Sequence, residues 1–585
     1  MISRLRRARR VLGAIRELGP SWVGFRLRYF AEKRTGLLLR RSPQSPWPEL
    51  GTAAATPPSL FDAELLRKWL QQNYSEDQIA HLRSHKERLG NRTFDVFGHP
   101  TKLDSWHHDP VADHTYEADL HWSKVPQHRG IDVKRVWEPS RFAWSYDLAR
   151  LHLIDPESGA GECFWDLFDW WCEENPPNSG INWACGQESS IRLMAVLLTV
   201  NAMRDTITDE RAAKLERFAA VTGTRVLANI AYARSQRNNH HTSEATGLIT
   251  VGALYPAVPR ARRFLRKGLK ELSDACGELI LEDGGSSQYS TNYHRVFLHG
   301  MTFADVALRA AEMERPASLI DALARATEYW TELADPTSGQ LPMLGHDDGA
   351  NILPLSHADH TDARPTMAIT EAVVNNRTVL SAGPWDEAPL WVGINPASLQ
   401  RQLLDLPDQS IRSFPQMGTH ILCNGGYRVV LRCGPYQFRP SIDDQLHVEI
   451  WHRGYPIVTS PGTYSYNPPE GSSVFEHSNR PIHPVSPWME RLGPFLYAGY
   501  GTARIVSVGG SGIPSIEAQD QNGEFWVTRR IEVGRDMVTI TDRSDDSAPL
   551  SHFVGSGVGD LQVEGQSATE EAEVPAGYGN TGTAL

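Results

Sequence analysis

Apolar residues recur with helical spacing over a long central part of the chain, between residues 132 and 374. Side chains three and four residues apart lie on one face of a helix, so each such segment is predicted to be a helix. The predicted helices lie at residues 137–141, 164–171, 188–198, 209–233, 246–255, 261–281, 295–313 and 316–333. Short polar turns, such as residues 175–180, separate them. A series of helical hairpins of similar length indicates an (α/α) toroid, with the polar turns collected at one end as a cleft.

Helical spacing disappears in the last third of the chain, where short runs of β-branched and aromatic residues are divided by Gly, Pro, Asp and Asn. This pattern is typical of an antiparallel β-sandwich. Strands are predicted at residues 427–432, 447–451, 455–459, 525–528 and 537–541, and a short β-like patch at 93–98. The tail from Ser567 onward is small and polar and is expected to fray.

A chain of 585 residues is too long for one ordinary hydrophobic core, so two or three domains are expected. The predicted fold is a multidomain α and β protein, an N-terminal (α/α) toroid followed by an antiparallel β-sandwich. We divide the chain into a basic N-terminal helical segment with its connector (1–110), the toroid (111–385), a linker (386–409) and the sandwich (410–585).

Charge is distributed unevenly along the chain. Residues 1–41 carry twelve Arg and Lys against two Glu, whereas the whole chain has a net charge of −12. The acidic body does not attract a polyanion at long range, so binding one would depend on local Arg, His and amide groups. No nucleic-acid partner is expected. The basic N-terminal segment, interleaved with apolar residues, is a candidate for peripheral membrane contact, and docking on its own protein is the alternative. No apolar run reaches the roughly 18 residues of a membrane span.

Neither a metal site nor a cofactor is predicted. The six cysteines form no CxxC pair and are expected to be buried thiols. A cluster of His and Asp at residues 107–114 resembles a metal site in composition only, because its spacing fits no standard site, and we expect a solvated loop there.

Two polar clusters carry the candidate chemistry. The first, at residues 237–248, holds two amides, two imidazoles and a carboxylate between apolar helices. The second, at residues 283–295, holds amides, phenols, an imidazole and Arg295 on the next helical hairpin. If the clusters face each other, the site can neutralise a carboxylate and move a proton next to it.

Several short stretches occur in an order and spacing that carry a family resemblance. They are residues 132–141, 175–176, 180–183, 187–188 with Arg192, 238–240, 293–294, 439–441, 444–447 and 461–466. With these stretches most of the chain resembles the heparinase II/III-like and alginate-lyase-like polysaccharide lyases. The resemblance implies an (α/α) toroid, a β-sandwich, and β-elimination on a polysaccharide that contains uronic acid.

The resemblance also implies roles for single residues. Asn239 and His240 hold the uronate carboxylate and neutralise it, as an oxyanion hole would. Tyr293, 54 residues after Asn239, donates a proton to the leaving oxygen and can also act as base, with His294 as partner base or orienting group. The candidate substrate-binding residues are Asn238, His241, Trp183, Gln187, Glu188, Arg192, Gln288 and Arg295. Burial or pairing within the chain explains Trp183, Gln187, Glu188 and Arg192 nearly as well.

Two positions depart from the family pattern. Ile442 stands where many relatives carry a His that reaches into the cleft, and Ser460 stands where relatives tend to have an Asp associated with zinc. We therefore expect no metal in the sandwich, and the elimination would depend on Tyr293 and His294.

Three functions stay open from the sequence. The first is a lyase acting on an acidic polysaccharide. The second is a glycoside hydrolase on the same toroid, with a carboxylate among Glu244, Asp283, Asp347 and Asp348. The third is a non-catalytic glycan-binding or polysaccharide-assembly protein. The resemblance places the protein in the cell envelope or periplasm, whereas the missing export signal favours the cytoplasm.

Overall fold

The computed structural model of the chain describes residue 19 and residues 22–546, with gaps. The gaps are at 51–55, 129, 405–406, 439, 441, 461, 464–466, 468–477, 482, 484–489, 494–495, 499–501, 510–511 and 523–524. The tail from Ser567, the first 18 residues and parts of the matched stretches at 439–441 and 461–466 lie outside the described residues.

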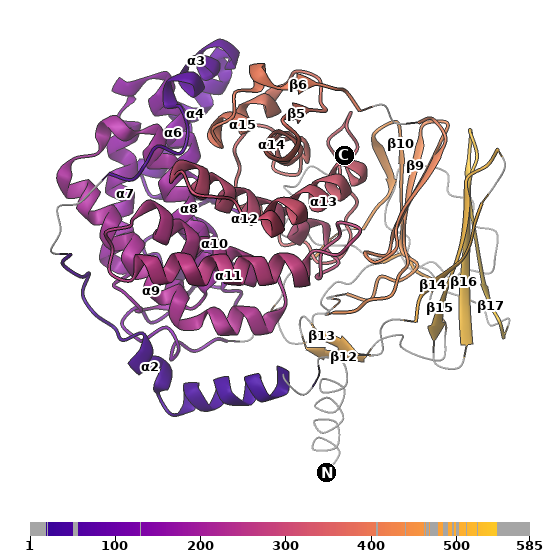
Figure 1. The fold of residues 1–585 in the computed structure, drawn as a ribbon, viewed down its shortest axis with the longest axis horizontal. Coiled ribbons are helices and arrows are strands. Elements are labelled where there is room, and N and C mark those ends of the chain that lie inside the picture. The colour runs from indigo at the N-terminus through magenta and orange to yellow at the C-terminus, as the bar shows by residue number, and fades with distance from the viewer. Residues whose placement is uncertain are drawn as a thin grey trace.

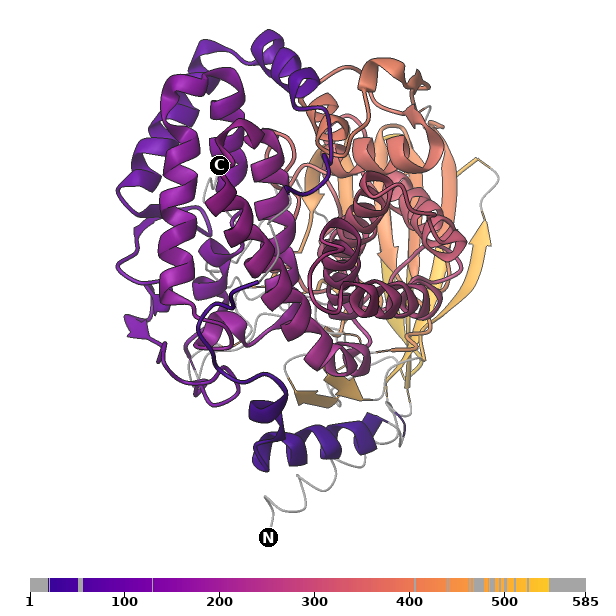
Figure 2. The same cartoon turned by 60° about the vertical axis from the view of Figure 1, so that its left-hand side comes forward.

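Helices dominate the first two thirds of the chain and form an (α/α) toroid (Figures 1 and 2). The leading elements are α2 (Leu37–Arg41), α3 (Ala63–Asn73), α4 (Glu76–Gly90), β1 (Thr93–Val96), β2 (His99–Lys102), β3 (His108–Asp109) and β4 (His114–Thr115). The helices that follow are α5 (Lys134–Ser140), α6 (Ser145–Ile154), α7 (Ala160–Glu174), α8 (Gly186–Ala202), α9 (Asp209–Gln236), α10 (Asn239–Leu254), α11 (Ala261–Leu279), α12 (Thr291–Ala310), α13 (Ala317–Leu333), α14 (Arg364–Asn375) and α15 (Ala388–Trp391).

Helices α8, α10 and α12 are buried along almost their whole length, whereas α11 buries a single face. Small residues allow α10 to approach its neighbours closely. A Cβ on Gly247 would lie 2.3 Å from the hydroxyl oxygen of Ser190 on α8, and one on Gly252 would lie 2.5 Å from the backbone nitrogen of Leu265 on α11. Close packing of this kind fixes where α10 begins relative to the rest of the toroid.

The predicted helices are confirmed, but five of them begin earlier than the apolar pattern indicates, and two of these, α10 and α12, begin within the polar clusters. Helix α10 begins at Asn239 rather than Thr246, because the Asn238 side chain accepts a hydrogen bond from His240 N and caps the helix. Helix α12 begins at Thr291, where Ser290 caps Tyr293 N in the same way. The first polar cluster therefore forms mostly the first turns of α10, whereas the second consists of the loop at residues 283–290 and the first turn of α12.

Two antiparallel sheets follow the toroid (Figure 1). The five-stranded sheet has the order β11-β10-β9-β8-β7 and the four-stranded sheet the order β14-β15-β16-β17. The strands are β5 (Arg377–Thr378), β6 (Gln400–Arg401), β7 (Ser410–Phe414), β8 (Thr419–Asn424), β9 (Tyr427–Arg432), β10 (Val448–His452), β11 (Tyr455–Val458), β12 (Glu490–Gly493), β13 (Leu496–Ala498), β14 (Arg504–Gly509), β15 (Ser515–Asn522), β16 (Phe525–Val533) and β17 (Val538–Ser544). Leu431 and Val448 of the first sheet share a core with Val527 and Ile531 of the second, which confirms the predicted sandwich.

The outer face of the five-stranded sheet packs on the toroid. Tyr289, from the loop before α12, shares an apolar cluster with Val430 and Trp451. The buried guanidinium of Arg432 donates to the Tyr289 carbonyl at 2.6 Å and to the Met417 carbonyl at 3.0 Å. These contacts hold the sandwich against the end of the toroid where α12 begins.

The predicted solvated loop at residues 107–114 is partly wrong. His107 and Asp109 are fully buried. Hydrogen bonds satisfy both side chains there, since His107 hydrogen-bonds the Glu174 carbonyl at 3.0 Å and Asp109 accepts from the backbone nitrogens of Val111 and Ala112.

The domain boundaries at residues 110, 385 and 409 stay predictions. Within the described residues, no helix has the length and apolar character needed to cross a membrane.

Candidate active site

The first turns of α10 and α12 meet at one end of the toroid. Asn239 N donates to the Gln288 side chain at 2.8 Å, and Gln288 lies in the loop that leads into α12. Further along, the Thr246 hydroxyl donates to the Gly300 carbonyl at 2.9 Å, so the two helices run side by side. Backbone N–H groups are exposed at a helix N-terminus, which favours an anion there.

The loop from Leu344 to Ala350 folds onto the start of α12. The Ser290 hydroxyl donates to the His346 carbonyl at 2.6 Å, and Thr291 N donates to the Leu344 carbonyl at 2.9 Å. Gly345 has φ +70°, and a Cβ there would lie 2.4 Å from the Tyr289 carbonyl. Only glycine permits this approach without strain, and the approach brings Asp348 next to Tyr293.

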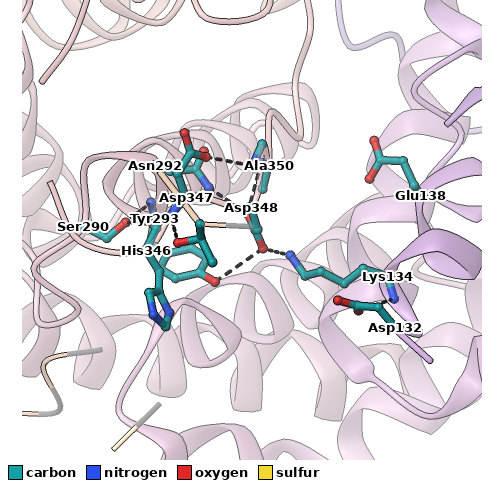
Figure 3. Close-up of polar contacts among 12 residues, drawn as sticks. Asp132, Lys134, Glu138, Ser290, Asn292, Tyr293, His346, Asp347, Asp348 and Ala350 are labelled. Carbon is teal, nitrogen blue, oxygen red and sulfur yellow. Dashed lines mark hydrogen bonds and ion pairs between the residues drawn. The ribbon is translucent and has the colours of Figure 1, made fainter. Parts of the chain in front are cut away.

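Asp348 is the centre of a buried polar cluster (Figure 3). Its carboxylate accepts from Asn292 Nδ2 at 2.7 Å, from Ala350 N at 3.1 Å and from the Tyr293 hydroxyl at 3.4 Å. The Lys134 ammonium, from α5 on the other side of the site, forms an ion pair with the same carboxylate. One carboxylate therefore contacts both the candidate proton carrier and a buried cation.

Burial lowers the pKa of Lys134 to about 7, and the like charge of Arg141 acts in the same direction. Nearby carboxylates, Asp132 first among them, oppose this shift. A buried amine with a pKa near neutrality can take up or release a proton in the working range of an enzyme. Lys134 and Asp348 together can therefore hold a proton beside the Tyr293 hydroxyl.

His240 lies close to two other buried acidic groups, the Cys185 thiol and the Glu244 carboxyl. Its Nδ1 is 3.6 Å from Sγ of Cys185, and Glu244 follows one helical turn later on α10. Burial raises the pKa of Glu244 to about 8 and that of the Cys185 thiol to about 11. Gly186 makes room for this carboxyl, because a Cβ there would lie 2.5 Å from Glu244. Both acidic groups are consequently neutral at neutral pH, so neither places a negative charge next to His240.

Four candidate binding residues lie in the interior on the α8 side. Trp183 is fully buried, and Gln187 is 7% exposed. Glu188 accepts two hydrogen bonds from Arg141, at 2.7 and 2.8 Å. Arg192 stacks on an indole ring and donates to the Ser140 carbonyl at 2.6 Å. The structure gives Trp183, Glu188 and Arg192 internal partners, whereas the buried Oε1 of Gln187 has no hydrogen-bond partner among the described residues. None of the four side chains hydrogen-bonds the Tyr293 hydroxyl in the described part of the chain.

The imidazoles of His294 and His241 are also internal. His294 Nε2 donates to the Ala326 carbonyl at 3.0 Å, and burial lowers its pKa to about 4, so the ring is neutral. His241 lies 2.6 Å from the Glu271 carboxylate on α11. Successive helical side chains point about 100° apart, which turns these rings away from Tyr293 and His240.

Arg295 and Asn238 support the site from its edge. Arg295 donates to the Asn292 side chain at 3.1 Å and to the His360 carbonyl at 2.6 Å. Asn238 caps α10, and Gln288 joins the two helices as described above. Asp283, a candidate for hydrolysis, accepts from the backbone of the sandwich loop at Gln416 and is occupied there.

The sandwich contributes to the same region. Thr463 accepts from Asp347 N at 3.2 Å, and Ile442 is a buried apolar residue. Lys134 and Asp348 were not predicted as parts of a lyase site, and Asn292, which lies in the second polar cluster, was given no role of its own. Lys134 did lie in a stretch that carries the family resemblance, and Asp348 was considered only for hydrolysis.

Two family models match the chain: Heparinase II/III N-terminus over residues 75–352 and Heparinase II/III-like, C-terminal over residues 407–480. Among solved structures, a heparinase III is 14% identical with a TM-score of 0.57, covering 92% of this chain and 80% of that one. A second heparinase III is 14% identical with a TM-score of 0.48 and coverages of 80% and 70%. A mutant of the heparan sulfate lyase HepC from Pedobacter heparinus is 15% identical with a TM-score of 0.44 and coverages of 83% and 78%.

A search of curated proteins found no match. The two family models together cover more than half of the chain, in the order that the toroid and the sandwich require. The first heparinase III shares this fold. The chain belongs to the heparinase II/III-like polysaccharide lyase family.

Proposed function

We propose that the protein cleaves an acidic polysaccharide by β-elimination next to a uronic acid. The observation that carries this proposal is the Tyr293 hydroxyl, which lies against the Asp348–Lys134 pair at the end of the toroid where α10 begins with Asn239 and His240. Membership of the lyase family supports the reaction type.

Elimination removes the proton on C5 of the uronate, beside its carboxylate. The resulting carbanion is prohibitive unless the carboxylate charge is neutralised. In the proposed complex the Asn239 amide and the His240 imidazole bind this carboxylate. Burial holds Glu244 and Cys185 neutral, so neither of these two groups competes as an anion with the substrate carboxylate.

Tyr293 carries the protons in this proposal. Its phenolic proton passes to the Asp348–Lys134 pair when the substrate binds, and the phenolate then takes the C5 proton. The C5–H electron pair forms the C4–C5 double bond as the C4–O4 bond breaks, and O4 receives its proton from Tyr293. The pair then returns its proton to Tyr293, so the enzyme ends as it began. His294 has no part in this scheme, because its ring is buried against the Ala326 carbonyl.

Incubation with alginate, heparin-like polymers and bacterial uronate polymers tests the proposal, since only elimination creates a conjugated uronate that absorbs in the ultraviolet. Tyr293→Phe should lower the turnover number at least about 100-fold, the usual contribution of general acid–base catalysis. Tyr255→Phe is the matched control, because this buried phenol lies at the far end of α10 and its hydroxyl has no hydrogen-bond partner in the described part of the chain. Equal activity of the two variants would refute the role of Tyr293.

A further inference from the structure

The N-terminal segment presents an apolar stripe to solvent. Residues 22–34 form a helix, in which Leu27 is 67% exposed and Phe30 is 63% exposed. With Ala31 and Arg34, which are also exposed, they occupy positions i, i+3, i+4 and i+7, which share one helical face. Large apolar side chains grouped on a solvent-facing stripe indicate a partner that buries them.

This helix, drawn in indigo beside α2 in Figures 1 and 2, contacts the toroid through its opposite face. The ring of Tyr29 packs 4.4 Å from that of Tyr232 on α9, and the Arg26 guanidinium donates to the Tyr232 hydroxyl at 3.1 Å. Burial raises the pKa of Tyr29 to about 12. The apolar stripe is therefore held in a fixed orientation, pointing away from the protein.

Cations surround the stripe. Arg28, Lys33 and Arg34 are exposed on this helix and Arg40 on α2. Arg28 and Arg41 share the carboxylate of Glu32. The sequence before the helix adds six arginines in residues 1–18, whereas the rest of the chain beyond residue 41 has a net charge of −22. An anionic surface attracts the basic segment and repels the acidic body, so this uneven charge orients the protein with its N-terminal segment toward such a surface.

We infer that this helix docks the protein on an anionic lipid bilayer, with Leu27 and Phe30 inserted at the headgroup boundary and the cations on the phosphates. An acidic polysaccharide would satisfy the cations but not the exposed aliphatic and aromatic side chains. Tyr232 lies near the end of α9, shortly before α10 begins, so docking holds the candidate active site near the membrane surface. The inference does not depend on catalysis.

Flotation of the full chain with vesicles tests it. The protein should bind vesicles of phosphatidylcholine with phosphatidylglycerol, and not vesicles of phosphatidylcholine alone. The double variant Leu27→Glu/Phe30→Glu should reduce the partition coefficient at least about tenfold, and Lys33→Gln/Arg34→Gln by roughly fivefold per residue. Both pairs are solvent-exposed, so an unchanged melting temperature can be verified for each.

Two matched controls should bind as the unmodified protein does. Val508→Glu/Met537→Glu changes two exposed apolar residues of the sandwich, one in β14 and one just before β17. Arg262→Gln/Arg263→Gln removes exposed cations of α11, a helix that displays no large apolar side chain to solvent. Absence of binding to anionic vesicles, or unaltered binding of the Leu27/Phe30 variant, would overturn the inference. The inference would also be overturned if the protein bound a soluble uronate polymer in place of vesicles and the Leu27→Glu/Phe30→Glu variant bound that polymer equally well.

Discussion

Replacing Asp348 by Asn tests whether this carboxylate compensates the charge of Lys134. Asp348 is buried and the Lys134 side chain is only 12% exposed. Desolvation has already lowered the pKa of Lys134 to about 7. The amide of the variant retains the shape of the carboxylate but carries no charge, so it no longer favours the ammonium form. The pKa of Lys134 should therefore fall below 7 in Asp348→Asn.

This shift has a defined sign in a stability measurement. In the unfolded chain Lys134 is protonated at any pH below about 10. Below pH 7 the folded unmodified protein also binds this proton, whereas the folded variant does not. The free energy of unfolding of the variant should thus drop below that of the unmodified protein by about 1.4 kcal/mol for each pH unit below 7, or about 3 kcal/mol near pH 5. Breaking a buried ion pair costs a similar amount, about 3–5 kcal/mol.

Urea unfolding followed by tryptophan fluorescence, at several pH values between about 5 and 8, measures this difference. Asp347→Asn is the control, because the neighbouring carboxylate accepts from Gly349 N and contacts solvent more than Asp348 does. Adding Lys134→Met to Asp348→Asn should remove the pH dependence. A stability gap that is constant with pH, or that widens toward alkaline pH, would refute the reasoning.

Two further predictions concern buried carboxyls. Burial raises the pKa of Glu244 to about 8, so the folded protein holds a proton there that the unfolded chain loses above about pH 4.5. Between pH 4.5 and 8 the free energy of unfolding of the unmodified protein should therefore fall by about 1.4 kcal/mol per pH unit relative to that of Glu244→Gln. Parallel thermal-unfolding profiles of the two proteins would contradict this. Glu188→Gln should lower the free energy of unfolding by about 3–5 kcal/mol, since it leaves the Arg141 guanidinium without its bidentate partner. A Glu188→Gln protein of unchanged stability but raised KM would instead place Glu188 in the substrate site.

The regular elements were predictable because their signals are local. Residues 164–171 repeat aromatics at helical spacing and lie within α7, and residues 427–432 coincide with β9. The starts of α10 and α12 were predicted too late, because their first turns are polar. Capping by Asn238 and Ser290 satisfies those turns, and a cap outweighs low apolar content at a helix start.

The candidate site was predictable only for residues within the two polar clusters, at 237–248 and 283–295. Asn239, His240 and Tyr293 lie at helix starts that the chain brings together. Lys134 and Asp348 reach Tyr293 through tertiary contacts between α5, the loop after α13 and α12, which no local pattern reveals. In the reverse sense, no local pattern distinguishes an arginine that lines a cleft from one stacked on a buried indole.

The central claim is that polymer cleavage proceeds by elimination. Mass spectrometry of the products from a uronate polymer tests this most directly, because elimination leaves an unsaturated uronate at each new non-reducing end, whereas hydrolysis adds one water for each cut. The account predicts fragments that lack this water in the unmodified protein and in Tyr255→Phe, and nearly none from Tyr293→Phe. Fragments that each contain the added water would contradict it.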